Sequence, residues 1–187
     1  MQPRMTARER DLFLAFARRS LRYLEFGTGG STLLAVDAVQ AWVISVGSSQ
    51  AWLESVRVAC PDAGDKLRLM HVDIGPVRDW GYPVGQEARA RWPRYHGAVW
   101  DMPDSREADL CFIDGRFRVA CFAQAVLQCG PGVLIGIHDF AMRDQYRVIH
   151  EIGREIAVAD ELAFFLPRPG TRDRAAEILA ERQYETA

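Results

Sequence analysis

The chain has 187 residues, 49% of them hydrophobic and 26% charged, which is enough to bury the core of a soluble domain. Its formal net charge of -2 excludes a general attraction to nucleic acid or to an anionic membrane. The charged amino terminus does not resemble a signal peptide, no apolar run approaches the roughly 20 residues of a membrane span, and the cysteines form no C-x-x-C pair. We therefore expect one cytoplasmic domain over residues 1–187.

The first predicted element is a helix within the amino-terminal segment 1–20. Thr6 and Glu9 have the spacing of a capping box, in which the two side chains satisfy free backbone N–H groups at a helix start. A helix over about 7–19 should follow, with its apolar side on the core and its arginines in solvent.

The rest of the chain alternates between short apolar segments and longer helical ones. The patterns predict strands over 21–26, 42–46, 67–72, 110–113 and 133–137, and an edge strand over 162–166. They predict helices over 31–38, 50–60 and 172–182, and one that carries Val119, Phe122 and Val126. This alternation indicates an α/β fold of the Rossmann-like type, a three-layer α/β/α sandwich with a mostly parallel sheet.

One long stretch, residues 73–108, has no regular pattern. It is rich in aromatic residues, which argues against disorder. We expect it to be an ordered cover over the sheet, and this is compatible with a second role as a wall of a substrate pocket.

The first strand runs directly into a glycine-rich turn. In open α/β sheets, ligands bind outside the carboxyl ends of the strands, and glycines there let the backbone approach the ligand. The turn resembles the first motif of class I S-adenosylmethionine-dependent methyltransferases, [DE]-x-G-x-G-x-[GS], matched by Glu25, Gly27, Gly29 and Ser31. The resemblance extends over about residues 20–140. It implies that the cofactor's methionine part contacts the segment Glu25, Gly27, Thr28, Gly29, Gly30 and Ser31.

Two further positions follow from this resemblance. Asp73 matches an acid that accepts the adenine amino group in the family. Gly47 stands where the family has an acid that binds both ribose hydroxyls, so Gly47 and Ser48 should lie beside the ribose. The missing charge-assisted contact is of a kind worth about 1.5–3 kcal/mol, and we expect weaker cofactor binding.

Three polar residues follow the fourth and fifth strands, namely Asp114, His138 and Asp139. Neighbouring strands lie about 4.8 Å apart, so these side chains should converge at the mouth of the sheet. Their pattern is similar to the small-molecule O-methyltransferase subgroup. They are predicted to act in catalysis, with His138 as a general base or all three binding a divalent metal. The alternative is hydrogen bonding that only shapes the turn.

Arg116 and Arg118 flank Phe117 at a predicted helix start. Positive charge is unfavourable there because of the helix dipole, so a compensating role is expected. Either the arginines receive an acidic group of the substrate, or they pair with Asp114 or another carboxylate.

These patterns together predict methyl transfer from S-adenosylmethionine to a small-molecule acceptor, since no basic patch or nucleic-acid motif is present. Two alternatives stay open. Gly47 favours a degenerate methyltransferase fold that binds a ligand without turnover. An NAD-dependent oxidoreductase shares the fold class, but the acid before the glycines counts against it.

Overall fold

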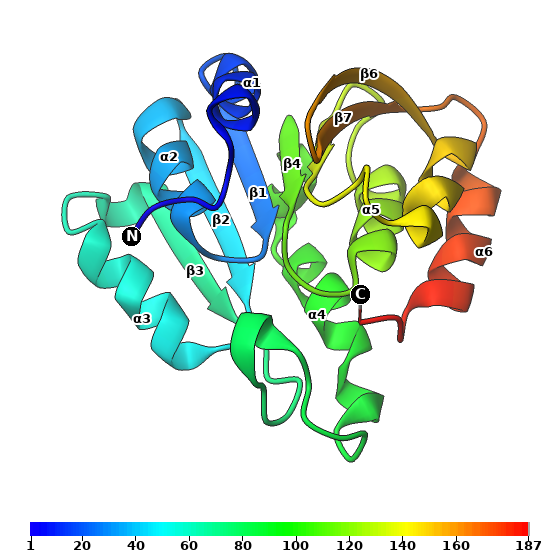
Figure 1. The fold of residues 1–187 in the computed structure, drawn as a ribbon, viewed down its shortest axis with the longest axis horizontal. Helices are drawn as coiled ribbons and strands as arrows, with labels where there is room; N and C mark the ends of the chain where they lie inside the picture. The colour runs from blue at the N-terminus through cyan, green and yellow to red at the C-terminus, as the bar shows by residue number, and fades with distance from the viewer. Residues whose placement is uncertain (187) are drawn as a thin grey trace.

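The computed structural model describes residues 1–186, which form a seven-stranded sheet flanked by helices (Figure 1). The strands are β1 (Arg22–Phe26), β2 (Trp42–Gly47), β3 (Leu67–His71), β4 (Leu110–Ile113), β5 (Leu134–Ile137), β6 (Gly153–Ala159) and β7 (Leu162–Pro167). Their order is β3-β2-β1-β4-β5-β7-β6. The pairs from β3 to β5 are parallel, and β7 is antiparallel to both of its neighbours. The predicted Rossmann-like α/β fold is confirmed.

The helices follow the strands in the expected alternation. They are α1 (Ala7–Ala17), α2 (Gly30–Ala38), α3 (Gln50–Ala59), α4 (Pro93–Gly97), α5 (Arg118–Gln128) and α6 (Arg172–Arg182). Short 3-10 helices span Gly64–Lys66, Asp79–Gly81, Arg89–Arg91, Ala98–Asp101, Pro103–Glu107 and Asp144–Glu151. No helix within residues 1–186 is long and apolar enough to cross a membrane.

Alternate residues of the strands enter two separate apolar layers, as the pleat of a sheet requires. Tyr23 of β1 packs with α1 and α2 on one face, whereas Leu24 and Phe26 pack with α4, α5 and α6 on the other. The same alternation in β4 buries Phe112 on the first face and Ile113 on the second. Both faces of the central strands are therefore covered, which is why their sequences are apolar throughout.

The region 73–108 is an ordered cover, as predicted. Tyr95 and Trp100 are buried against the second face, where both rings contact Phe26 at centroid distances of 6.3 and 6.1 Å. The earlier part of the region folds back on itself through a bridge between Val77 and Pro83. That part lies at the ends of the strands, where it lines a cleft.

One strand assignment was wrong. The segment 162–166 is a strand, β7, but it lies between β5 and β6 and not at the edge. The edge strand is β6, which the sequence patterns missed because its polar start, with Arg154 and Glu155 exposed, interrupts the apolar pattern. The antiparallel pair β6–β7 thus extends the sheet beyond its parallel part.

Candidate active-site cleft

A cleft of about 1140 Å³ opens at the carboxyl ends of β1, β2, β4 and β5. This is the place where open α/β sheets bind their ligands, and the volume is at the upper end of the usual range for such sites. Most of the predicted site residues line it: Gly27, Thr28, Gly29, Gly30, Ser31, Gly47, Ser48, Asp114, Arg116, Arg118, His138 and Asp139. Glu25 and Asp73 are not among the lining residues.

Glu25 is fully buried and faces α2 instead of the cleft. Its carboxylate accepts hydrogen bonds from the hydroxyls of Tyr23, Ser31, Thr32 and Ser45, the last at 2.9 Å. Burial raises its pKa to about 7, although these hydrogen bonds act in the opposite direction. Glu25 therefore supports the glycine turn from below, and its expected contribution to cofactor binding stays a prediction.

The structure requires glycine at some positions of the turn and not at others. Gly27 adopts a φ of +114°, and a Cβ there would lie 2.4 Å from the backbone nitrogen of Gly115. A Cβ on Gly30 would lie 2.3 Å from the nitrogen of Pro3, so the amino-terminal segment packs directly on this helix start. A Cβ on Gly29 would meet only the Trp52 indole nitrogen, at 3.7 Å. Gly29 is therefore the glycine of this turn that packing leaves free.

The start of α2 also differs from the sequence expectation. Gly29 is the N-cap residue, and its backbone N–H donates to the hydroxyl of Thr32 at 2.9 Å. Ser31, where the predicted helix begins, lies inside the first turn and its hydroxyl donates a hydrogen bond to Glu25. The first residues of α2, Gly30 and Ser31, line the cleft, so the helix start faces the ligand site.

Gly47, at the end of β2, has no room for a side chain in the present packing. A Cβ there would lie 2.9 Å from the Thr28 hydroxyl and 3.1 Å from Leu53. The neighbouring Ser48 lies against the cover, because a Cβ on Gly81 would be 3.0 Å from its hydroxyl. The absence of an acid at position 47 is thus part of how the turn and α3 pack.

Asp73 lies outside the cleft, which corrects its predicted role. Its carboxylate accepts a hydrogen bond from the backbone N–H of Gly75 at 2.8 Å and pairs with Arg91. The side chain is 58% exposed. Asp73 therefore stabilises its own turn and offers nothing to a ligand in the cleft in this arrangement.

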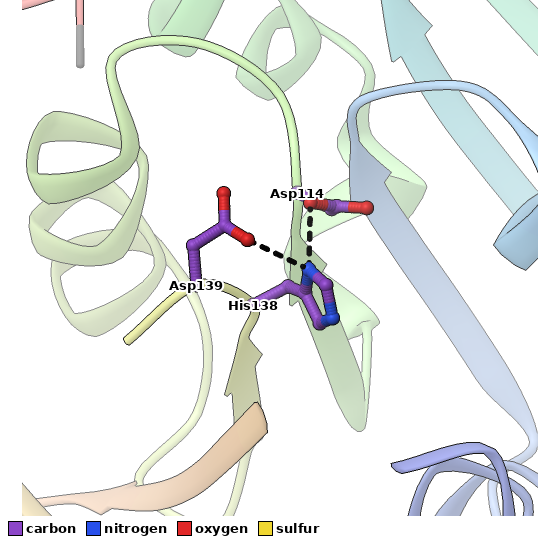
Figure 2. A group of neighbouring side chains, drawn as sticks. All are labelled: Asp114, His138 and Asp139. Carbon is purple, nitrogen blue, oxygen red and sulfur yellow. Dashed lines mark ion pairs between the residues drawn. The ribbon is translucent and has the colours of Figure 1, made fainter. Parts of the chain in front are cut away.

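The convergence of Asp114, His138 and Asp139 is confirmed (Figure 2). The His138 Nδ1 atom lies 3.4 Å from an Asp114 oxygen and 3.3 Å from an Asp139 oxygen. Burial lowers the His138 pKa, but the hydrogen bonds and charges of the two aspartates outweigh it and raise the pKa to about 10. His138 is consequently protonated near neutral pH, so the predicted role as general base is corrected.

Arg118 completes the cluster from within the core. It is 2% exposed, and its Nη2 atom lies 3.2 Å from Asp114 and 3.0 Å from Asp139. Its Nε donates to the Gly115 carbonyl at 2.9 Å. Of the two alternatives for Arg118, pairing with Asp114 is therefore the one observed, and its guanidinium is already engaged by the protein.

The donor set does not fit a divalent metal in this arrangement. Ligand atoms of Asp114, His138 and Asp139 lie within 4.8 Å of one another, which is close enough for a shared ion. However, the His138 Nδ1 atom already faces one oxygen of each aspartate, at 3.4 and 3.3 Å. The Arg118 guanidinium also occupies carboxylate oxygens of both aspartates. The cluster is therefore a set of ion pairs and does not form a metal site in this arrangement.

A third acidic residue, Glu9, reaches the cluster from α1. One of its oxygens lies 3.4 Å from the His138 Nε2 atom and also accepts a hydrogen bond from the Thr6 backbone N–H at 2.7 Å. The other oxygen accepts from the Glu161 N–H at 2.8 Å. The capping box was predicted correctly, but nothing in its spacing indicates that Glu9 also faces a histidine.

Several cleft residues were not singled out from the sequence, among them Tyr82 and Arg143. The Arg116 guanidinium lies 3.9 Å from the centroid of the Tyr82 ring, and Arg143 pairs with Asp139 at 3.0 Å. Burial raises the Tyr82 pKa, but the two arginines outweigh it and lower the pKa below its ordinary value. The spacing of Arg143 four residues after Asp139 was a usable signal. Met1–Met5 and Trp52 also line the cleft.

No family model and no curated protein matches the sequence. Solved structures do. A methyltransferase-like protein from Silicibacter pomeroyi superimposes with a TM-score of 0.86 at 25% identity, covering 98% of this chain and 97% of that one.

Less similar structures also match. An O-methyltransferase from Bacillus cereus in complex with S-adenosylhomocysteine has a TM-score of 0.53 at 13% identity, covering 95% of this chain and 69% of that one. An RNA methyltransferase from Salinibacter ruber with the same ligand has a TM-score of 0.54 at 16% identity, covering 89% of this chain and 95% of that one. Among these neighbours are enzymes for different acceptors, so the small-molecule subgroup is not decided by them. The chain has the Rossmann-like methyltransferase fold.

Proposed function

We propose that this chain is an S-adenosylmethionine-dependent methyltransferase with a small-molecule acceptor. The observation that carries the proposal is the cleft at the carboxyl ends of the strands, bounded by the glycine turn and the start of α2. Structures with the same fold include methyltransferases that hold S-adenosylhomocysteine. The cleft volume of about 1140 Å³ is sufficient for a cofactor and a small acceptor together.

The residues around the turn fit this cofactor. The start of α2 lines the cleft, and a helix N-terminus suits the carboxylate of its methionine part. A Cβ on Gly29 would meet only the Trp52 indole nitrogen, at 3.7 Å, so packing leaves space for a ligand beside it. Ser48 provides a hydroxyl at the end of β2, beside the turn. When bound, the cofactor supplies an electrophilic methyl group on a sulfonium. The chain's task is then to orient the acceptor and to exclude water.

Asp114 is the residue best placed to orient an acceptor hydroxyl. One of its oxygens contacts His138 and Arg118, whereas the other accepts no hydrogen bond from residues 1–186. The side chain is 30% exposed and lines the cleft. In this proposal His138 and Arg118 fix the carboxylate, and its free oxygen accepts a hydrogen bond from the acceptor.

Calorimetric titration with S-adenosylmethionine, S-adenosylhomocysteine and NAD in parallel tests the proposal. We expect both sulfur compounds to bind with one site per chain and NAD to give no saturable heat. Release of S-adenosylhomocysteine in the presence of small acceptors then tests turnover. Saturable NAD binding without binding of either sulfur compound would replace the methyltransferase by a nucleotide-cofactor enzyme of another class.

A second candidate is a protein that binds the cofactor without turnover. The specific observation in its favour is that the His138 Nδ1 atom faces two carboxylates, at 3.4 and 3.3 Å. Their hydrogen bonds and charges raise the His138 pKa, which disfavours a role as base. Gly47 also has no side-chain carboxylate that could bind the ribose hydroxyls. S-adenosylhomocysteine binding combined with no methyl transfer across neutral and already ionised acceptors would favour this candidate.

A further inference from the structure

Arg116 is a buried cation that residues 1–186 leave without a counterion. It is 4% exposed, yet it lines the cleft. Its Nε atom has no hydrogen-bond partner among residues 1–186, and no carboxylate of that part of the chain lies within 4.0 Å of the guanidinium. Within residues 1–186, its hydrogen bond to the backbone is a long one, 3.4 Å from Nη1 to the Thr186 carbonyl. A buried charge in this state is costly unless something else pairs with it.

The neighbouring arginines are in a different state. Arg118 pairs with Asp114 and Asp139, and Arg143 pairs with Asp139, so the aspartates of the cleft cluster are already neutralised. Arg116 lies two residues after Asp114, and its charge has no carboxylate partner in this cluster. The positive charge at this point of the cleft therefore exceeds what the cluster balances.

Residues of the cover, the region 73–108, contact the Arg116 side chain and fix its position. Its guanidinium lies 3.9 Å from the centre of the Tyr82 ring, and its Cγ atom would be 3.9 Å from a Cβ on Gly81. A guanidinium held on an aromatic face keeps its N–H edge free, and this planar edge matches the two oxygens of a carboxylate or phosphate.

From this arrangement we propose that Arg116 is the binding residue for an oxyanion, a carboxylate or a phosphate, carried by the molecule that occupies the cleft. The identification of that molecule as the methyl acceptor rests on the proposed function. The oxyanion site itself stands on the buried, unpaired guanidinium and the ring beneath it.

The test uses probes of matched shape and different charge. Wild-type protein is titrated calorimetrically with sodium benzoate, with neutral benzamide and with inorganic phosphate, both in saturating S-adenosylhomocysteine and without it. We expect benzoate or phosphate to bind at least about tenfold more tightly than benzamide, as a charge-assisted pair requires. The tighter of the two anions distinguishes a carboxylate-bearing ligand from a phosphate-bearing one.

Variants then assign the site. Arg116→Met should weaken anion binding about tenfold or more, and Arg116→Lys should recover part of it, because a lysine keeps the charge but not the planar edge. Arg147→Met is the control, since Arg147 is 77% exposed, pairs with Asp144 and also loses one positive charge. Thermal unfolding confirms that each variant is folded. If Arg116→Met fails to fold, the lysine variant and the wild-type comparison of benzoate with benzamide still test the oxyanion site.

Anions that bind wild type no more tightly than benzamide, or equally to wild type and a folded Arg116→Met, would overturn the oxyanion site. Failure of the proposed function has a different signature. In that case S-adenosylhomocysteine does not bind wild type, while the anion titrations without it still depend on Arg116.

Discussion

The charged side chains of the cleft acquire their chemistry from one another. Asp114 and Asp139 hold His138 on one side, and the buried Arg118 neutralises both carboxylates on the other. Each pair excludes a role that the isolated residue type suggests, such as a free histidine base or a metal-binding aspartate pair. Of Asp114, Arg116, Arg118, His138 and Asp139, what remains available to a ligand is one Asp114 oxygen and the Arg116 guanidinium.

The first prediction concerns the protonation of His138. Its pKa of about 10 means that the imidazolium persists through neutral pH, and the stability it contributes is full below about 6.5 and lost as the pH rises through about 10. NMR of the ring protons should show no titration of His138 between pH 6 and 8. The exposed His71 serves as the internal control, observed in the same spectra. A His138 midpoint between 6 and 7 would restore it as a candidate general base.

The same cluster leads to a prediction on metals. Because Arg118 and His138 pair with one oxygen of Asp114 and with both oxygens of Asp139, we expect Mg²⁺ and Mn²⁺ at millimolar concentration to leave the unfolding temperature unchanged. EDTA should also have no effect on S-adenosylhomocysteine affinity. A saturable rise of the unfolding temperature with either ion, absent in Asp114→Asn, would show that the ion pairs open to admit a metal.

Glu25 leads to a prediction on stability. Its pKa of about 7 lies above the ordinary value of 4.5, so the folded state binds this proton more tightly than the unfolded chain. The corresponding stability is full below about pH 4.5 and is lost as the pH rises through about 7. The loss is roughly 3 kcal/mol by linkage. Urea unfolding of wild type and Glu25→Gln across this range should show that the glutamine variant lacks this decrease. Parallel curves would contradict the account.

Some of these residues could be predicted and others could not, for physical reasons. The ends of β4 and β5 had to be adjacent, so the convergence of Asp114, His138 and Asp139 followed from chain order alone. The direction of Glu25 follows from the alternation along β1, which places it on the face of Tyr23 and α2. The approach of Tyr82 and Glu9 depends on how distant segments fold back, and no local pattern records that.

At the scale of secondary-structure elements, the parallel part of the sheet was the most predictable. Strands buried on both faces have continuous apolar sequences, and the helices between them begin and end at recognisable residues. The amphipathic edge strand β6 and the short helices of the cover lack such signals. Their structure is determined by what they pack against, chiefly β7 and the ring of Phe117.

Gly136 in the middle of β5 allows two aromatic rings to approach the strand. A Cβ there would lie 2.7 Å from the Phe164 ring and 2.9 Å from Phe112. We therefore expect Gly136→Ala to lower the free energy of unfolding by about 1–3 kcal/mol through overpacking. Urea unfolding measures the change, and Gly132→Ala is the control because nothing lies within 4 Å of its added Cβ. Equal stability of the two variants would show that the rings move aside without cost.

At the scale of the whole molecule, the cleft is assembled from parts that are far apart in sequence. The amino-terminal segment packs on Gly30, the cover reaches Ser48 and Arg116 through Gly81, and α1 reaches His138 through Glu9. The sheet alone does not form the cleft, and the volume depends on the closure of these segments over it.

The central claim is that the cofactor binds at the glycine turn, and calorimetry of S-adenosylhomocysteine with wild type and Gly29→Val tests it most directly. Gly29 is extended and a Cβ there has space beside Trp52, so the variant should fold normally. A valine side chain would occupy the ligand's place, and we predict that binding is lost in Gly29→Val and kept in the exposed control Gly132→Val. Unchanged affinity in folded Gly29→Val would contradict the account.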